Sequence, residues 1–313
     1  MKMSYKVVRN TGAHYVVEAP DGALIPCKAK GNFRIRGIRT TNPVAVGDEV
    51  EISAPGPDGT AYITRILPRR NYIIRRASNL SKESHILAAN ISQAALVVTL
   101  AHPATSTTFI DRFLATAEAY NVPARIIVNK IDLLGDPDDR ALLDAVCYLY
   151  RSIGYGVDTV SARTGEGIEA LRESLRGYTT LICGNSGVGK STLINALVPG
   201  LDLRTGEISA VHDQGMHTTT FSEMFRLPGG GEIIDTPGIR GFGTIDFDPA
   251  QVAHYFPDLF AASASCRFSN CTHTHEPGCA VLAALDEHRI AASRYQSYLS
   301  ILDEAASAEK YRK

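Results

Sequence analysis

Short apolar runs alternate with turn sequences over the first 66 or so residues, and the runs show no helical period. Runs at residues 14–19, 23–30, 47–53 and 60–67 have the length and composition of β-strands. Turn sequences such as PDG and APGPDG separate them. Several short strands at this spacing predict a small β-barrel or β-sandwich at the N-terminus.

From about residue 91, apolar runs alternate with helical segments. The runs that predict strands lie at residues 94–100, 124–129, 157–162, 179–184 and 231–236. Helices are expected between them at residues 110–120, 139–153 and 190–197. This alternation predicts a parallel sheet with helices on both faces, whose ligands bind at the carboxyl ends of the strands. Beyond about residue 250 the pattern is helical, and it closes with a long helical stretch at residues 291–313.

Composition places the chain among globular proteins. Its 313 residues are 44% hydrophobic and 21% charged, which excludes disorder of the whole chain. No apolar run approaches the roughly 18 residues that a membrane-spanning helix needs. The N-terminal sequence MKMSYKVVRN lacks an apolar signal core, so we expect a cytoplasmic protein without a membrane partner.

The net charge of −1 conceals a basic N-terminal module. Residues 1–76 carry a formal charge of +7, whereas the remainder of the chain carries −8. Basic side chains gather around Phe33, and four of them are our candidates for contacts with a polyanion: Lys28, Lys30, Arg34 and Arg36. The asymmetry favours a polyanionic partner. A solvated basic surface is the alternative interpretation of the same cluster.

The segment Gly184–Ser191 reads GNSGVGKS and fits the phosphate-loop pattern G-x-x-x-x-G-K-S/T. It follows an apolar strand and precedes a helical run, which is the context that the motif requires. Its glycines let backbone N–H groups surround phosphate oxygens, and the helix N-terminus adds positive potential. Lys190 is expected to reach the β- and γ-phosphates, and Ser191 to bind Mg²⁺. A chance glycine-rich turn is the alternative.

Asn129-Lys130-Ile131-Asp132 follows another apolar strand and resembles the guanine-specificity motif NKxD of GTPases. The Asp carboxylate of that motif accepts two hydrogen bonds from guanine, which adenine cannot supply. Taken alone, four such residues could be a helix-capping turn. Beside a phosphate loop, they argue against the alternative of an ATPase or a small-molecule kinase.

Three further segments resemble GTPase motifs, but their order is unusual. Ser161-Ala162 resembles the supporting base-contact motif, and Asp235-Thr236-Pro237-Gly238 resembles DxxG, whose Asp holds Mg²⁺ through water. Thr218–Thr220 could supply the switch threonine, and we choose Thr219. In an ordinary GTPase the phosphate loop precedes NKxD, whereas here it follows. The order indicates a circular permutation, which is tolerable because domain termini commonly lie close together.

A cluster of cysteine and histidine residues lies near the C-terminus. Cys266, Cys271 and Cys279, with a histidine, form a Cys₃His set suited to tetrahedral Zn²⁺. Because such a set leaves no open coordination position, we expect a structural zinc site. His273 and His275 compete for the imidazole position, and three cysteines buried by chance would be the alternative.

Together these features resemble the RsgA (YjeQ) family of GTPases that depend on the small ribosomal subunit. The resemblance rests on GNSGVGKS, NKID, SARTGEG, HTTT, DTPG and CRFSNCTHTHEPGCAV, and it covers nearly the whole chain. It implies a multidomain protein with an N-terminal OB-fold β-barrel, a central circularly permuted α/β P-loop GTPase domain and a C-terminal α-helical zinc-binding domain. We place these domains at residues 1–66, 91–250 and 251–313, with a linker at 67–90.

The resemblance also implies an activity and its residues. The activity is hydrolysis of GTP to GDP and phosphate, stimulated by the small (30S) subunit during its late maturation, with 16S rRNA as the contact. Zn²⁺ and Mg²⁺ are the implied ions, and a monomer is expected. His273 is the zinc ligand in the family pattern. The expected GTP-binding residues are Asn129, Lys130, Ile131, Asp132, Ser161, Ala162, Gly184, Asn185, Ser186, Gly187, Val188, Gly189, Lys190, Ser191 and Gly238; those for Mg²⁺ are Ser191, Thr219 and Asp235.

Position 239 separates this chain from Ras-like enzymes, which place a water-orienting Gln after DxxG. Ile239 can neither donate nor accept a hydrogen bond. In the family, this role is proposed for the His before the threonine cluster, here His217, which is our catalytic candidate. Two alternatives stay open: His217 contacts RNA or solvent, or the protein is an RNA-binding module whose nucleotide site is a slow binary switch.

Overall fold

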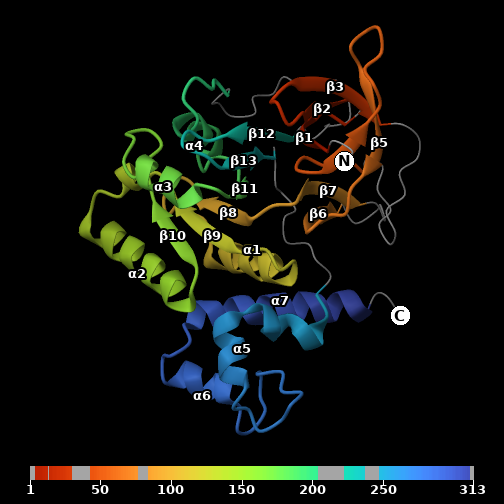
Figure 1. Ribbon diagram of the computed structural model, residues 1–313. Coiled ribbons are helices and arrows are strands. Elements are labelled where there is room, and N and C mark those ends of the chain that lie inside the picture. Colours follow the sequence, from red (N-terminus) through yellow and green to blue (C-terminus); the bar gives the residue numbers. More distant parts are fainter. Residues whose placement is uncertain are drawn as a thin grey trace, which may run out of the picture.

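The computed structural model describes residues 4–12, 14–29, 43–76, 84–203, 222–236 and 247–310. Its described parts form an N-terminal barrel, a central sheet covered by helices and a C-terminal helical region (Figure 1). The predicted fold class is confirmed, including the closed barrel that sequence patterns alone could not distinguish from a sandwich.

Five strands make the barrel: β1 (Tyr5–Asn10), β2 (Tyr15–Glu18), β3 (Leu24–Ala29), β4 (Glu49–Ile52) and β5 (Ala61–Ile66). They follow the order β1-β2-β3-β5-β4, and β4 pairs with β1 to close the barrel. Alternating residues of these strands point inward, so Val7, Val17 and Ile63 are fully buried in its core. Lys28 lies exposed on β3, whereas Lys30, Arg34 and Arg36 fall outside the described residues.

The segment predicted as a linker contains a β-hairpin formed by β6 (Tyr72–Arg76) and β7 (Ser84–Ala89). It is attached to the barrel, because the Ala89 N–H donates to Val46 O over 2.9 Å. A Cβ on Gly47, whose φ is 91°, would lie 2.0 Å from Ala89 O, so only glycine allows this approach. Arg69 closes the junction through two 2.6 Å hydrogen bonds to buried Asp48.

The central sheet has the order β10-β9-β8-β11-β13-β12. Five parallel strands correspond to the five predicted runs: β8 (Gln93–Val98), β9 (Ala124–Val128), β10 (Gly156–Thr159), β11 (Thr179–Gly184) and β13 (Glu232–Asp235). A sixth strand, β12 (Ser222–Arg226), is antiparallel to β13 and was not predicted. It also pairs with β1, with Arg9 opposite Glu223, so the barrel continues the central sheet.

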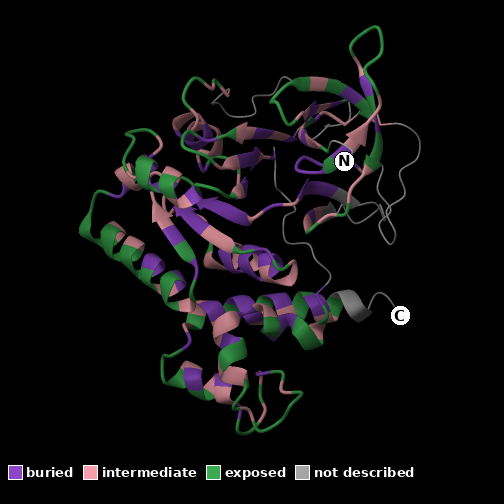
Figure 2. Cartoon of the chain, in the orientation of Figure 1, coloured by how far each residue is buried: buried purple, intermediate pink, exposed green. Residues whose placement is uncertain are grey.

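Helices cover both faces of this sheet, as predicted (Figure 2). One face packs against α1 (Thr107–Ala119) and α2 (Pro137–Ile153), and the other against α3 (Ile168–Leu175) and α4 (Lys190–Leu197). A short 3₁₀ helix, η1 (Ile131–Leu133), follows β9. Two separate apolar clusters therefore hold β11 between them, and the loop that follows β11 starts from a fixed position.

The C-terminal region contains the 3₁₀ helix η2 and three α-helices: η2 (Pro249–Tyr255), α5 (Pro257–Ser263), α6 (Ala280–Asp286) and α7 (Ala292–Lys310). They share an apolar cluster that includes Phe256, Val281 and Tyr298, and Ala115 of α1 belongs to the same cluster. Helix α7 runs beside α1, where Figure 1 shows the two helices adjacent. The C-terminal region is thus packed directly on the central domain.

Candidate nucleotide site and metal centre

The phosphate loop begins at the carboxyl end of β11 and ends in α4, as its sequence predicts. Gly187 and Gly189 have φ values of 85° and 84°, which favour glycine. A Cβ on Gly189 would lie 2.6 Å from Asn129 Nδ2, so the loop also requires glycine for space. Val188 is buried between these glycines and anchors the loop to the sheet.

Lys190 and Asp235 meet at the edge where β11 and β13 end. Ile182 and Asp235 are register partners in the parallel pair, which brings the end of β13 to the phosphate loop. The Lys190 ammonium forms an ion pair with the Asp235 carboxylate, and both side chains are mostly buried. A cationic donor and a carboxylate oxygen therefore stand together where phosphate and Mg²⁺ would need them.

Asn129 connects three of the predicted motifs. Its side chain is 2% exposed, and its Nδ2 donates to Val188 O of the phosphate loop over 2.9 Å. Its Oδ1 accepts from the Ala162 N–H over 3.0 Å. The asparagine of NKID thus holds the phosphate loop and the Ser161-Ala162 segment in one arrangement.

Asp132 presents a carboxylate held at both oxygens. Buried Ser161 donates to Oδ1 over 2.5 Å, and exposed Arg163 donates to Oδ2 over 2.5 Å. These hydrogen bonds, that of Ser161 above all, lower the pKa of Asp132 despite some desolvation. The group is therefore ionised at neutral pH and offers the two acceptors that guanine N1–H and N2–H require.

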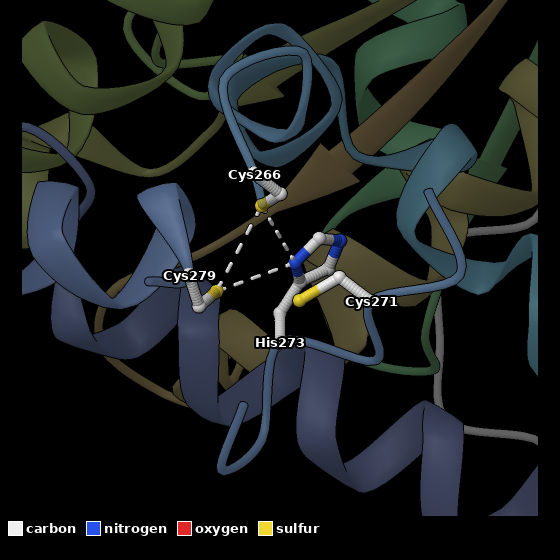
Figure 3. A group of neighbouring side chains, drawn as sticks. All are labelled: Cys266, Cys271, His273 and Cys279. Atoms are coloured by element: carbon white, nitrogen blue, oxygen red, sulfur yellow. Dashed lines mark hydrogen bonds between the residues drawn. The ribbon is translucent and has the colours of Figure 1, made fainter. Parts of the chain in front are cut away.

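The Cys₃His residues converge in the C-terminal region (Figure 3). The ligand atoms of Cys266, Cys271, His273 and Cys279 all lie within 4.8 Å of one another. Nδ1 of His273 is 3.6 Å from Cys266 Sγ and 3.5 Å from Cys279 Sγ, and the two Sγ atoms are 4.0 Å apart. A tetrahedral zinc ion would place sulfur and nitrogen ligands about 3.5 Å apart and two sulfurs about 3.8 Å apart. The donor set and its spacing fit Zn²⁺.

His275, the rival for the imidazole position, is turned away from the cluster. Its Nδ1 is 2.8 Å from Thr274 Oγ1, and the residue belongs to the exposed loop rather than to the group of four. His273 is 3% exposed, and burial lowers its pKa, which favours the neutral imidazole that a metal needs.

Without a cation, the protein environment favours the neutral thiol at Cys271. Burial and the neighbouring thiols of Cys279 and Cys266 raise the pKa of the Cys271 thiol to about 12. A bound divalent ion reverses this preference, because it stabilises the thiolate. Backbone amides supply further donors: Ala280 N lies 3.3 Å from Cys266 Sγ, and Leu282 N lies 3.5 Å from Cys279 Sγ.

Comparison with known proteins decides the family. A family model of the RsgA N-terminal domain matches residues 6–63. Another, of the RsgA GTPase, matches residues 66–245, which is more than half of the chain. The chain is 60% identical over 306 residues to a Bacteroides fragilis protein named small ribosomal subunit biogenesis GTPase RsgA, and the match covers 98% of both chains. The chain belongs to the RsgA GTPase family.

Other relatives agree with this assignment. A Porphyromonas gingivalis protein of the same name is 60% identical over 310 residues, covering 98% of each chain. The crystal structure of YjeQ from Thermotoga maritima matches with a TM-score of 0.78 and 34% identity, covering 98% of this chain and 99% of that one. YloQ, described as a circularly permuted GTPase, matches with a TM-score of 0.74 and 27% identity, covering 99% and 96%. The permutation predicted from motif order is thereby confirmed.

For this RsgA-family chain, several predicted residues lie outside the described structure. His217, Thr219, Gly238 and Ile239 are among them, and their roles stay predictions. Sequence reasoning missed Arg163 and the loop 99–106, both of which contact the predicted motifs. Arg163 follows Ser161-Ala162 directly, which was the available signal. The described helices include none that is both long and apolar enough to cross a bilayer.

Proposed function

We propose that this GTPase acts in the biogenesis of the small (30S) ribosomal subunit, contacts 16S rRNA and hydrolyses GTP to GDP and phosphate when stimulated by that subunit. The observation that carries the proposal is the 60% identity over 98% of the chain to relatives named for this role. The joining of phosphate loop and NKID by Asn129 supports it. We propose a monomer that works in the cytoplasm.

Nucleotide binding follows from the residues at the ends of β11, β9 and β13. Backbone N–H groups of Gly184–Ser191 would surround the phosphates, and Lys190 would exchange its partner Asp235 for phosphate oxygens. Asp132 would accept hydrogen bonds from guanine, and the Ser161 hydroxyl would hold its carboxylate in place. Mg²⁺ would be held by the hard oxygen donors of Ser191, Asp235 and Thr219, and it would stabilise charge on the phosphates.

Binding to the subunit provides a direct test of the proposed partner. The protein is incubated with separated small or large subunits and a non-hydrolysable GTP analogue, and bound protein is measured by sedimentation. We expect co-sedimentation with small subunits only, and less of it with GDP. Equal binding to both subunits would contradict the proposed partner.

His217 is proposed to orient the attacking water, because the Ile239 side chain cannot form a hydrogen bond with that water. His217→Ala should leave GTP affinity nearly unchanged and lower subunit-stimulated turnover about 100-fold, the usual scale for losing a positioned base. Lys190→Ala is the contrast, since it should lose affinity as well as rate. Stimulated turnover of His217→Ala at the wild-type rate would show that the imidazole is a bystander.

The Cys₃His cluster is proposed to bind one structural Zn²⁺. Cys271→Ser should lower the zinc content, measured by atomic absorption, and unfold the C-terminal region, because removing a ligand removes folding free energy. The variant should still bind nucleotide, because the phosphate loop belongs to another domain, but more weakly than wild type, because α1 loses its contacts with α7. His275→Ala is the matched control for His273→Ala, and only the latter should lose zinc. Stoichiometric zinc in Cys271→Ser would exclude this ligand set.

The barrel is proposed to bind rRNA through phosphates. Changing Lys28, Lys30, Arg34 and Arg36 together to Ala leaves up to four phosphates without their cation. The slope of log affinity against log salt, measured by filter binding, should then shrink by roughly 0.7–0.9 for each phosphate that is no longer neutralised. If the slope stays the same, the rRNA binds to another domain.

A further inference from the structure

The loop 99–106, which joins β8 to α1, touches both nucleotide motifs. Lys130 Nζ donates to His102 O over 2.7 Å and to Gly187 O over 2.6 Å, so it joins this loop to the phosphate loop. The Pro103 ring also faces Gly187, because a Cβ placed there would lie 3.3 Å from Pro103 Cδ. A shift of this loop would therefore move the phosphate loop as well.

The loop has a fixed internal structure. Thr99 is fully buried, and its hydroxyl donates to Pro103 O over 2.5 Å. Thr105 folds back on Thr99: its N–H donates to Thr99 O over 2.8 Å, and its hydroxyl accepts from Thr99 N over 3.2 Å. Ser106 then caps α1 by accepting from the Phe109 N–H over 3.3 Å. Loop and helix thus form one continuous unit.

Helix α1 is joined to the C-terminal region by a buried charge cluster. Asp111 accepts a 2.7 Å hydrogen bond from Arg294 of α7, and neither side chain is more than 1% exposed. Arg294 also donates to both oxygens of Asp258 on α5, over 2.7 and 3.1 Å. On the surface, Arg112 of α1 pairs with Glu304 of α7.

Helix α7 reaches the metal centre at its other side. Tyr295 donates its hydroxyl to His273 O over 2.7 Å, and Tyr298 donates to Thr272 O over 2.7 Å. Tyr295 is the direct neighbour of Arg294 in the chain. An unbroken series of contacts therefore runs from the phosphate loop through loop 99–106, α1 and α7 to the segment that carries the Cys₃His residues.

We propose that loop 99–106 is a positioning element of the nucleotide site and that the C-terminal region sets its position through α1. This inference rests on the nucleotide site proposed above. Rigid helices and packed buried charges transmit displacement, and coupling between two sites acts equally in both directions. What docks on the C-terminal region would then change nucleotide affinity, and nucleotide would change the order of that region. This coupling runs through α1 and α7, so it does not depend on the chain segment that follows DTPG.

Thr99 tests the first half of the proposal. Thr99→Val keeps the shape but removes the hydroxyl that fixes Pro103, whereas Thr99→Ser keeps that hydroxyl. We expect the Kd for GDP, measured by titration calorimetry, to rise roughly 2- to 30-fold in Thr99→Val and to return within about twofold of wild type in Thr99→Ser. Wild-type affinity in Thr99→Val would overturn the positioning role.

Arg294 tests the second half. Arg294→Lys keeps the charge but loses the fork that joins Asp111 and Asp258, and we expect GDP affinity to fall roughly 2- to 30-fold. Arg125→Lys is the matched control, because Arg125 forms a largely buried ion pair with Asp158 of β10 and donates to Ser174 O of α3, and its affinity should stay within about twofold of wild type. Unchanged affinity in a folded Arg294→Lys would overturn the coupling.

Hydrogen exchange of the wild-type protein tests the coupling even if one of these variants does not fold. By reciprocity, GDP should slow hydrogen exchange at amides of residues 272–279 and 292–298 in the full-length, metal-loaded protein. No change there on adding GDP would overturn the proposal. Lys190→Ala separates this inference from the site on which it rests: if Lys190→Ala binds GDP like wild type, the proposed nucleotide site is wrong.

Discussion

Asp132→Asn is expected to convert the protein from GTP binding to xanthosine triphosphate binding. The substitution places an NH₂ donor opposite the N–H groups of guanine, whereas the 2-oxo group of xanthine accepts that donor. GTP affinity should fall about 100-fold or more, because a site built around a buried polar pair rejects a ligand that leaves it unsatisfied. Competition against a fluorescent guanine nucleotide measures both affinities.

Asp138→Asn is the control, because it makes the same chemical change outside the site. Asp138 lies exposed in the first turn of α2. Its GTP affinity should match wild type. ATP should compete poorly with either nucleotide in the wild type. If Asp132→Asn kept the wild-type preference for GTP, NKID would not be the base-reading motif.

Arg294→Leu is expected to destabilise the fold by about 3–5 kcal/mol, because it leaves Asp111 and Asp258 without their cation. Asp111 is fully buried, and Arg294 also packs its guanidinium 4.6 Å from the centre of the Phe256 ring. Urea denaturation followed by circular dichroism measures the change. Arg289→Leu, at an exposed pair with Glu287, is the matched control and should cost less than about 0.5 kcal/mol.

The destabilisation in Arg294→Leu should depend on pH. Burial raises the pKa of Asp111 above that of an unfolded chain, although Arg294 counteracts the effect, and removing Arg294 raises it further. The folded variant then binds this proton more tightly than the unfolded chain does, so its stability increases as the pH falls. The destabilisation should be smaller near about pH 5 than near about pH 8. A second change, Asp111→Asn, should recover part of the stability, and no recovery would contradict the charge argument.

Features whose residues lie close together in the sequence could be predicted from local patterns. The phosphate loop has a strand before it and a helix after it, and β11 and α4 begin and end where the pattern placed them. The Cys₃His residues lie within one short stretch, so spacing alone indicated the cluster. Choosing between His273 and His275 needed the family pattern, because both lie within reach of the cysteines along the chain.

Features that depend on distant pairing were not predictable in this way. β12 pairs with β1 across more than 200 residues, and its five residues carry two charges, so it does not stand out as a strand. The sequence pattern predicts a linker at residues 67–90, whereas the structure has the hairpin β6–β7 there, docked on distant Val46 through Ala89. Loop 99–106 contains no nucleotide motif, and its contacts with Lys130 and Gly187 arise only from the sheet order β9-β8-β11.

Hydrolysis stimulated by the small subunit is best tested by measuring GTP turnover with small subunits, with large subunits and without ribosomal particles. We expect slow turnover by the protein alone, strong acceleration by small subunits and none by large ones, and loss of the acceleration in Lys190→Ala. Turnover that is the same in all three conditions would contradict hydrolysis stimulated by the small subunit and would favour a nucleotide-binding switch.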